Sequence, residues 1–223
     1  MKKYYEAYDK RYRQIHKKSL SWSVENNTPI VEETIRRYCL EDTRMLEIGC
    51  GEGRDARYLL NKNYDVLAVD VSLEAIDYCI RKDPEHRKNY AVADILTEND
   101  IHENYGFIYS VACLHMLVPD EDRRGFYRFI CEHLEDDGYA LILSMGDGRM
   151  EYRSDITEAF NDVKRIHQES EEEVCIAATS CRIVNSDTFQ KEAQDNGFRI
   201  LEYGMTQIKN HFDQMMYMII KKH

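Results

Sequence analysis

The chain has 223 residues, and 43% of them are apolar, which is enough to build the core of one α/β domain and little for two. Its formal net charge of −11 disfavours nucleic acid as a partner, because a phosphate backbone repels an acidic surface. Seven scattered cysteines without a CxxC pair argue against a disulfide framework or a zinc site and favour a reducing, cytoplasmic compartment. The apolar runs are too short to cross a bilayer, so we expect no membrane partner, and because no metal-ligand spacing is present we expect no metal.

About forty residues precede the first predicted strand. Tyr4, Tyr8 and Tyr12 recur at every fourth position, as on one face of a helix, and Trp22 follows them. Such a helix either packs its aromatic face on the core or closes over a ligand site as a lid, and the sequence leaves both readings open. We expect residues 1–40 to form a helical cap on a domain that spans residues 41–223.

From residue 45 onward, short β-type runs alternate with helical patterns, which is typical of a parallel α/β sheet. The turn at 136–138 predicts the end of a helix, with Gly138 as a left-handed cap, and Ser186 is predicted to be an N-cap. The predicted helices span 54–61, 73–81, 121–134 and 187–195. The predicted strands span 45–48, 65–69, 90–93, 107–113 and 139–144, and an antiparallel pair follows at 198–207 and 214–221.

A glycine-rich segment, Gly49 to Gly53, follows the first predicted strand and has glycine at its first, third and fifth positions. It lies between a strand and a helix, where open α/β sheets bind their ligands. Glycines let a ligand approach the backbone, and the helix that begins near Arg54 offers free N–H groups. A dinucleotide-binding fingerprint reads GxGxxG, whereas the order here is GxGxG, which disfavours a nicotinamide cofactor.

With Glu47 two positions ahead of the first glycine, this segment resembles the first motif of class I S-adenosylmethionine-dependent methyltransferases. Its continuation from Gly53 to Leu59 is similar to the tellurite-resistance and thiol-type enzymes of that class. The resemblance implies a doubly wound, seven-stranded, mostly parallel α/β sheet with a reversed last strand, S-adenosylmethionine as cofactor and S-adenosylhomocysteine as product. Two alternatives stay open: a nicotinamide-dependent oxidoreductase on the same architecture, and a non-catalytic protein that retains the cofactor site.

Two acidic residues at later strand ends complete the expected cofactor site. Asp70, about twenty residues after the glycine loop, can accept both ribose hydroxyls of an adenosine group, and the alternative is an N-cap for the following helix. In the resembling family, an acid at the position of Asp94 meets the adenine amino group. The expected cofactor-binding residues are Glu47, Gly49, Cys50, Gly51, Gly53, Asp70, Val71, Asp94, Ile95 and Val111.

The expected reaction is an SN2 displacement at the sulfonium methyl carbon, which requires an aligned nucleophile in a site largely free of water. The sequence lacks an Asn-Pro-Pro-Tyr motif for amide or adenine amino groups and a Pro-Cys pair for pyrimidine rings. A small molecule is therefore the expected acceptor, and the resemblance suggests a thiol or another soft nucleophile. His115 is the candidate general base, with a packing role as the alternative.

The segment 146–184 follows the fifth predicted strand and is expected on the substrate side of the sheet. Its acid run at 169–173 is expected to be an exposed turn. A monomer and a homodimer both remain open. Residues that could contact the substrate are Tyr8, Tyr12, Trp22, Arg149, Tyr152, Arg153 and Arg182, and the arginines would suit an anionic one.

Overall fold

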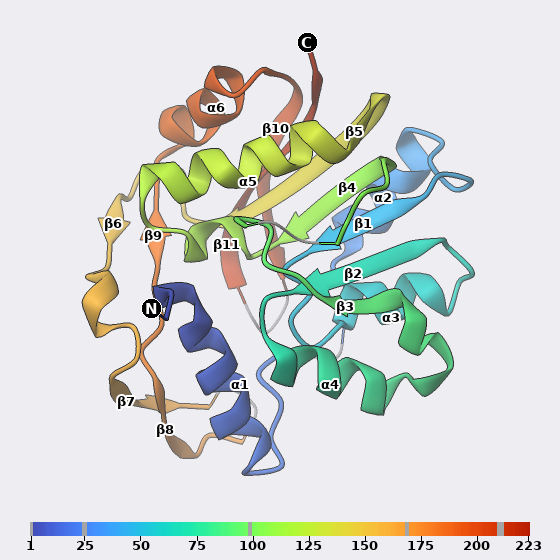
Figure 1. The fold of residues 1–223 in the computed structure, drawn as a ribbon. Coiled ribbons are helices and arrows are strands. Elements are labelled where there is room, and N and C mark those ends of the chain that lie inside the picture. The colour runs from blue at the N-terminus through green and yellow to red at the C-terminus, as the bar shows by residue number, and fades with distance from the viewer. Residues whose placement is uncertain (1, 24–25, 98–99, 168–169, 209–211) are drawn as a thin grey trace.

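The computed structural model describes residues 2–23, 26–97, 100–167, 170–208 and 212–223. Within them, a seven-stranded sheet has the order β10-β11-β5-β4-β1-β2-β3 (Figure 1). Neighbouring strands from β3 to β5 are parallel, whereas β11 runs antiparallel to both β5 and β10. The predicted fold, with its reversed last strand, is confirmed. The strands are β1 (Met45–Ile48), β2 (Val66–Asp70), β3 (Tyr90–Val92), β4 (Tyr105–Val111), β5 (Leu134–Met145), β10 (Phe198–Ile208) and β11 (Phe212–Lys222).

Helices cover both faces of this sheet. On one face lie α5 (Asp120–His133) and α6 (Ser186–Asp195), and on the other lie α2 (Pro29–Arg37), α3 (Arg54–Leu60) and α4 (Leu73–Lys82). Short 3-10 turns, η2 (Pro84–Asn89) and η3 (Leu114–Met116), join some of these elements. None of the helices in the described part of the chain has both the length and the apolar character needed to cross a membrane.

The two cores are built from alternate residues of the same strands. On β1, Leu46 and Ile48 pack with α5 and α6, whereas Met45 packs with α2, α3 and α4. On β4, Ile108 packs on the side of α5 and α6, whereas Phe107 packs on the side of α2, α3 and α4. Successive side chains of a strand point to opposite faces, so a sheet covered on both sides needs a nearly continuous apolar run.

The N-terminal forty residues divide into two parts. Val31 and Ile35 of α2 are buried against the sheet, so α2 belongs to the body of the domain. The segment before it contains η1 (Tyr4–Glu6) and α1 (Ala7–His16), and α1 contacts α4 and the hairpin of β7 and β8 (Figure 1). The part of the chain that lies beside the carboxyl ends of the strands is therefore α1 and its flanks.

The segment 146–184 forms two small antiparallel sheets beside the main one. Strands β6 (Tyr152–Arg153) and β9 (Arg182–Ile183) make the first, and β7 (Asp162–Ile166) and β8 (Glu173–Ala177) make the second, with η4 (Ile156–Glu158) between β6 and β7. The β8 side chains Val174 and Ile176 are fully buried against Ile15 of α1. The segment 146–184 and α1 are consequently packed together.

Two predicted caps are wrong. The predicted left-handed cap at Gly138 is absent, because the chain passes from His133 directly into β5 and Gly138 lies inside that strand. A Cβ at Gly138 would lie 2.8 Å from Cδ1 of Leu134, so close packing requires the glycine there. At α6, the N-cap is Asn185, whose side chain accepts a hydrogen bond from the backbone N–H of Thr188, and Ser186 is the first helical residue.

Candidate active site

A pocket lies at the carboxyl ends of β1 and β2, with α1 as one of its walls. Five of the ten residues expected to bind the cofactor line it: Gly49, Asp70, Val71, Asp94 and Ile95. From α1 and its flank, Tyr5, Tyr8 and Tyr12 also line it, together with Cys113 and Met116 beyond β4. The structure therefore brings the glycine loop, the two acidic strand ends and the N-terminal tyrosines to one pocket.

The glycine loop depends on the absence of side chains. Gly49, Gly51 and Gly53 have φ values of +71°, +53° and +72°, which residues with a Cβ rarely adopt. A Cβ at Gly49 would lie 2.6 Å from Sγ of Cys113, and one at Gly51 would lie 2.6 Å from Oη of Tyr12. Gly51 and Gly53 do not line the pocket, so their contribution is the shape of the loop.

Asp70 holds the glycine loop against β2. Its Oδ2 accepts a hydrogen bond from the N–H of Gly51 at 2.9 Å, and its Oδ1 accepts one from the N–H of Ser72 at 2.8 Å. The alternative N-cap role is wrong, because Ser72 caps α4 by accepting from Ala75. Burial raises the pKa of Asp70 above its usual range, although the two N–H donors oppose that shift.

Asp94 faces the pocket and is already in contact with the N-terminal segment. Lys3 Nζ lies 2.6 Å from Oδ2, and Tyr5 Oη donates to the same oxygen at 3.0 Å. Oδ1 accepts from the backbone N–H of Leu96 at 3.0 Å. A ligand that reaches Asp94 must therefore share this carboxylate with Lys3 and Tyr5.

Three other expected cofactor residues do not line the pocket. Glu47 is 3% exposed and accepts a hydrogen bond from Tyr109 Oη at 3.1 Å, and burial raises its pKa well above the usual range. Cys50 and Val111 are buried in the core on the same face of the sheet as α3 and α4. In this structure these residues pack beneath the residues that line the pocket.

A second, larger cavity adjoins the first, and the two share Tyr8 and Met116. His115 and Trp22 line it, as does Tyr152 from the 146–184 segment. His115 is 4% exposed, so it stands in a largely dry environment beside the boundary between the two spaces. This arrangement suits one ligand in each cavity, with reacting groups that meet near Tyr8 and Met116.

The arginines predicted to contact a substrate are not among the residues that line this cavity. Arg149 is exposed on the loop after β5, and Arg153 is exposed on β6. Arg182 donates to the carbonyl of Val118 at 2.9 Å and pairs with Asp120. The cationic side chains that do line the cavity are Arg11 and Arg165, and His167 lies with them.

These three residues are not predictable from the sequence, for different reasons. Arg11 lies three residues after Tyr8, but it belongs to a basic stretch with Arg13, Lys17 and Lys18, for which the simplest interpretation is a solvated face. Arg165 and His167 lie in a polar stretch without clear periodicity. Glu171, Glu172 and Glu173 of the acid run are exposed as predicted, whereas Glu169 lies outside the described residues.

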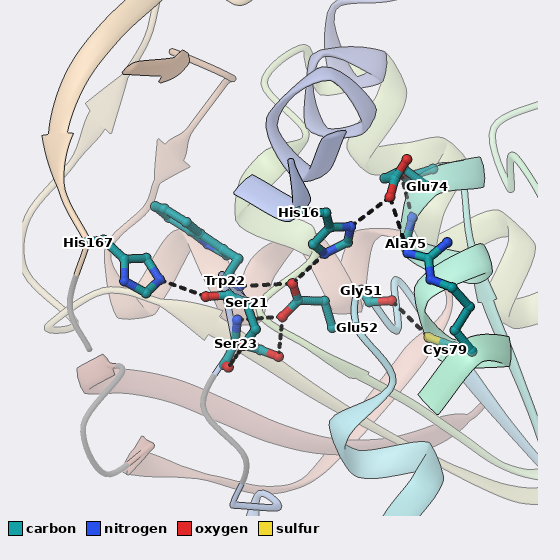
Figure 2. Close-up of polar contacts among 12 residues, drawn as sticks. His16, Ser21, Trp22, Ser23, Gly51, Glu52, Glu74, Ala75, Cys79 and His167 are labelled. Atoms are coloured by element: carbon teal, nitrogen blue, oxygen red, sulfur yellow. Dashed lines mark hydrogen bonds and ion pairs between the residues drawn. The ribbon is translucent and has the colours of Figure 1, made fainter. Parts of the chain in front are cut away.

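Glu52, the fourth residue of the glycine loop, anchors the N-terminal segment (Figure 2). Its carboxylate accepts hydrogen bonds from the backbone N–H groups of Trp22 at 2.8 Å and Ser23 at 2.7 Å, and from Ser23 Oγ at 2.7 Å. Nε2 of His16 lies 2.8 Å from the same carboxylate, and Nδ1 lies 2.8 Å from Glu74 of α4. The loop and the segment that covers it are therefore joined by one buried carboxylate.

The His16 contact makes docking of this segment pH-dependent. Burial lowers the pKa of His16, but its hydrogen bonds to Glu52 and Glu74 outweigh that effect, so the pKa is raised above 6.5. Burial raises the pKa of Glu52, but the hydrogen bonds from His16, Trp22 and Ser23 lower it by more than that. The pKa of Glu52 is therefore below 4.5. Because a raised histidine pKa stabilises the folded form below the unfolded pKa, docking is expected to be strongest between about pH 4.5 and 6.5.

We expect docking to weaken as the pH rises through the folded-state pKa of His16. Proteolysis at the exposed residues 17–19 should accelerate over that range in the wild type. His16→Gln should remove this pH dependence, whereas His86→Gln, which changes a histidine paired with Asp83 away from α1, should keep it. A pH profile of cleavage that is the same in the wild type and His16→Gln would contradict the assignment.

The comparisons with known proteins agree with this architecture. Residues 10–203 match the profile of a family described as a methyltransferase domain. The chain belongs to the methyltransferase-domain family. The family predicted from the sequence is confirmed, and the oxidoreductase alternative receives no support. Among the described residues of this methyltransferase domain, no group of three or more His, Cys, Asp or Glu side chains is arranged to hold a metal ion.

Two kinds of curated relative are similar to part of this methyltransferase domain. A probable S-adenosyl-L-methionine-dependent methyltransferase TehB of Haemophilus influenzae is 30% identical over 133 residues, which are 57% of this chain and 46% of the relative. An uncharacterized methyltransferase of Schizosaccharomyces pombe is 28% identical over 79 residues, 34% of this chain and 54% of the relative. The chain thus spans about half the length of the curated relatives it matches.

Solved structures share the fold of this methyltransferase domain at low identity. The CcbJ methyltransferase of Streptomyces caelestis superposes with a TM-score of 0.69 at 14% identity, over 96% of this chain and 98% of the other. A 1,6-didemethyltoxoflavin-N1-methyltransferase of Burkholderia thailandensis, solved with its substrate and S-adenosylhomocysteine, has a TM-score of 0.69 at 15% identity, over 94% and 84%. The glycopeptide N-methyltransferase MtfA, solved with S-adenosylhomocysteine, gives 0.63 at 16%, over 89% and 90%.

Proposed function

We propose that this methyltransferase domain binds S-adenosylmethionine in the pocket between the glycine loop and α1, and methylates a small molecule in the adjoining cavity. The observation that carries the proposal is the shared boundary of the two spaces at Tyr8 and Met116, with the glycine loop on one side. Family membership and the cofactor complexes of neighbours with the same fold support the choice of cofactor.

The residues present fit this cofactor. Gly49 lines the pocket without a side chain, so a ligand can approach the loop backbone there, and a Cβ at this position would clash with the Cys113 side chain. Asp70 is fixed by two backbone N–H groups, and its carboxylate can accept the ribose hydroxyls. When bound, the cofactor supplies an electrophilic methyl carbon on a sulfonium. Tyr8 and Met116 form the boundary and exclude water from it, which an SN2 displacement requires.

The acceptor is proposed to be a thiol or another soft nucleophile, in a reducing cytoplasm. The partial likeness to a probable TehB methyltransferase supports the acceptor class, and seven free cysteines support the compartment. A thiol ionises readily, so the domain needs only to orient it and to place one weak base beside it that accepts the proton. This matches a cavity boundary formed mostly by apolar and aromatic side chains.

Calorimetry with S-adenosylhomocysteine tests the proposed cofactor. We expect Asp70→Ala to weaken binding about 10- to 100-fold, because hydrogen bonds to a charged group contribute roughly 1.5–3 kcal/mol each. Asp65→Ala, an exposed aspartate at the opposite end of β2, is the matched control and should bind normally. Wild-type protein that binds no S-adenosylhomocysteine would refute the proposed function, and normal binding by Asp70→Ala would refute the ribose contact.

His115 is proposed as the group that accepts a proton from the acceptor. It lines the substrate cavity at 4% exposure and lies in η3, the short turn beyond the end of β4. We expect His115→Asn to lower kcat about 100-fold and to remove the acidic limb of the kcat profile, while leaving S-adenosylhomocysteine affinity unchanged. Full activity in His115→Asn with thiol acceptors would assign this histidine to packing.

A further inference from the structure

The substrate cavity contains a buried positive charge that has no carboxylate partner among the residues that the structure describes. Arg11 is 6% exposed and lies on α1, three residues after Tyr8. Its Nε and Nη2 donate to the carbonyls of Ala177 and Ala178 at 2.6–3.1 Å. Among the described residues, no carboxylate forms an ion pair with Arg11 and no acceptor binds Nη1. Neutral carbonyls thus accept some of the hydrogen bonds that the guanidinium can donate, but they leave its positive charge uncompensated.

The surroundings of Arg11 hold it rigidly in this place. Its guanidinium carbon lies 5.3 Å from the ring centroid of Tyr8 and 4.9 Å from that of Trp22, so it is stacked against two aromatic rings. Trp22 is itself fixed by its backbone hydrogen bond to Glu52. A planar donor held by rings and carbonyls is preorganised, so a ligand does not have to immobilise it.

A second arginine increases the positive potential in the same cavity. Arg165 of β7 lines the cavity and makes no ion pair with a described carboxylate. Burial lowers the pKa of Arg11, and the charge of Arg165 lowers it further, which means that the two guanidinium groups repel one another. Two cations that repel each other across a cavity are both stabilised by an anion between them.

The carboxylates at the cavity do not neutralise these arginines. Asp155 and Glu158 also line it, but both are exposed to solvent. Asp155 accepts from the backbone N–H and the hydroxyl of Thr157, and Glu158 accepts from the side-chain amide of Asn161. They are held by their own neighbours at the rim, whereas Arg11 is in the interior.

We propose that Arg11 and Arg165 bind an anionic group of the methyl acceptor, such as a carboxylate, so that the substrate is an anionic small molecule. This rests on the proposed function, because it names the chemistry of the acceptor in that same cavity. Since Arg11 lies three residues beyond Tyr8 on α1, the anionic group sits about one helical turn from the boundary with the cofactor pocket. An anion there would face Nη1 and complete its hydrogen bonds.

Three isosteric probes test this charge preference: benzoate, benzamide and benzamidinium. Trp22 is the single tryptophan of the chain and lines the cavity, so its fluorescence reports binding there without any methyl transfer. With S-adenosylhomocysteine present, we expect benzoate to bind at least about tenfold more tightly than benzamide, and benzamidinium to bind most weakly. Calorimetry on the same samples serves as the check, because substitutions beside Trp22 alter its fluorescence.

The benzoate preference should disappear in Arg11→Gln and decrease in Arg165→Gln. Arg165 is exposed and makes no ion pair with a described residue, so Arg165→Gln keeps the test valid if Arg11→Gln fails to fold. Arg149→Gln, an exposed arginine outside the cavity, should keep the full preference. Equal affinities for the three probes, or a preference that survives both variants, would overturn the anion site. If the wild-type protein ranks the three probes as expected but transfers no methyl group, the result would count against the proposed function and not against this anion site.

Discussion

Gly49→Val is expected to abolish S-adenosylhomocysteine binding and to lower Tm by roughly 5–15 °C. The valine would have to adopt a φ of +71°, and its Cβ would lie 2.6 Å from Sγ and 2.7 Å from Cβ of Cys113. Left-handed backbone costs about 1–2 kcal/mol and overpacking about 1–3 kcal/mol more, and each kcal/mol lowers Tm by about 2–4 °C in a domain of this size. Calorimetry and a thermal melt measure the two effects.

Two further variants separate the loop clash from backbone strain. Gly197→Val places valine at a φ of +87°, where a Cβ has no neighbour within 4 Å, so it should lose stability without losing ligand binding. Adding Cys113→Gly to Gly49→Val removes the nearest clash and should restore part of the stability. Normal ligand affinity in Gly49→Val would show that the loop backbone does not approach the ligand.

Deletion of residues 2–22 is expected to eliminate methyl transfer while the main sheet remains folded. The deleted segment supplies Tyr8 and Tyr12 to the cofactor pocket and Arg11 to the substrate cavity. It also covers Val174 and Ile176 through Ile15, so the 146–184 segment should become sensitive to proteases. Activity assays, circular dichroism and limited proteolysis together test this expectation.

The matched control for the deletion is Arg13→Ala, which changes an exposed residue of α1 and should leave activity and protease resistance unchanged. Because α2 packs Val31 and Ile35 against the sheet, the deletion stops short of it. An unfolded deletion variant would mean that α1 is essential to the core. Full turnover by the truncated protein would remove this segment from the reaction.

The glycine loop and Asp70 were predictable because their signals are local. The turn between strand and helix needs positive φ values and no Cβ, so glycine must stand at fixed positions in it. A parallel sheet then places the end of the next strand beside this turn. Alternation of short apolar runs with helical patterns likewise gave the order of elements before any contact was known. Gly138 was not predictable in this way, because a glycine required by close packing against Leu134 looks the same in the sequence as a glycine that caps a helix.

The amino-acid sequence by itself determined the fold class, the family and the position of the glycine loop, since each depends on residues close together along the chain. Tertiary structure alone decided which side chains line the second cavity. Arg11 binds the carbonyl of Ala177, 166 positions away, and Glu52 holds Trp22 and Ser23 across about thirty residues. The Arg11 contact arises from the packing of α1 on β8, and neither segment carries a periodicity that reveals its partner.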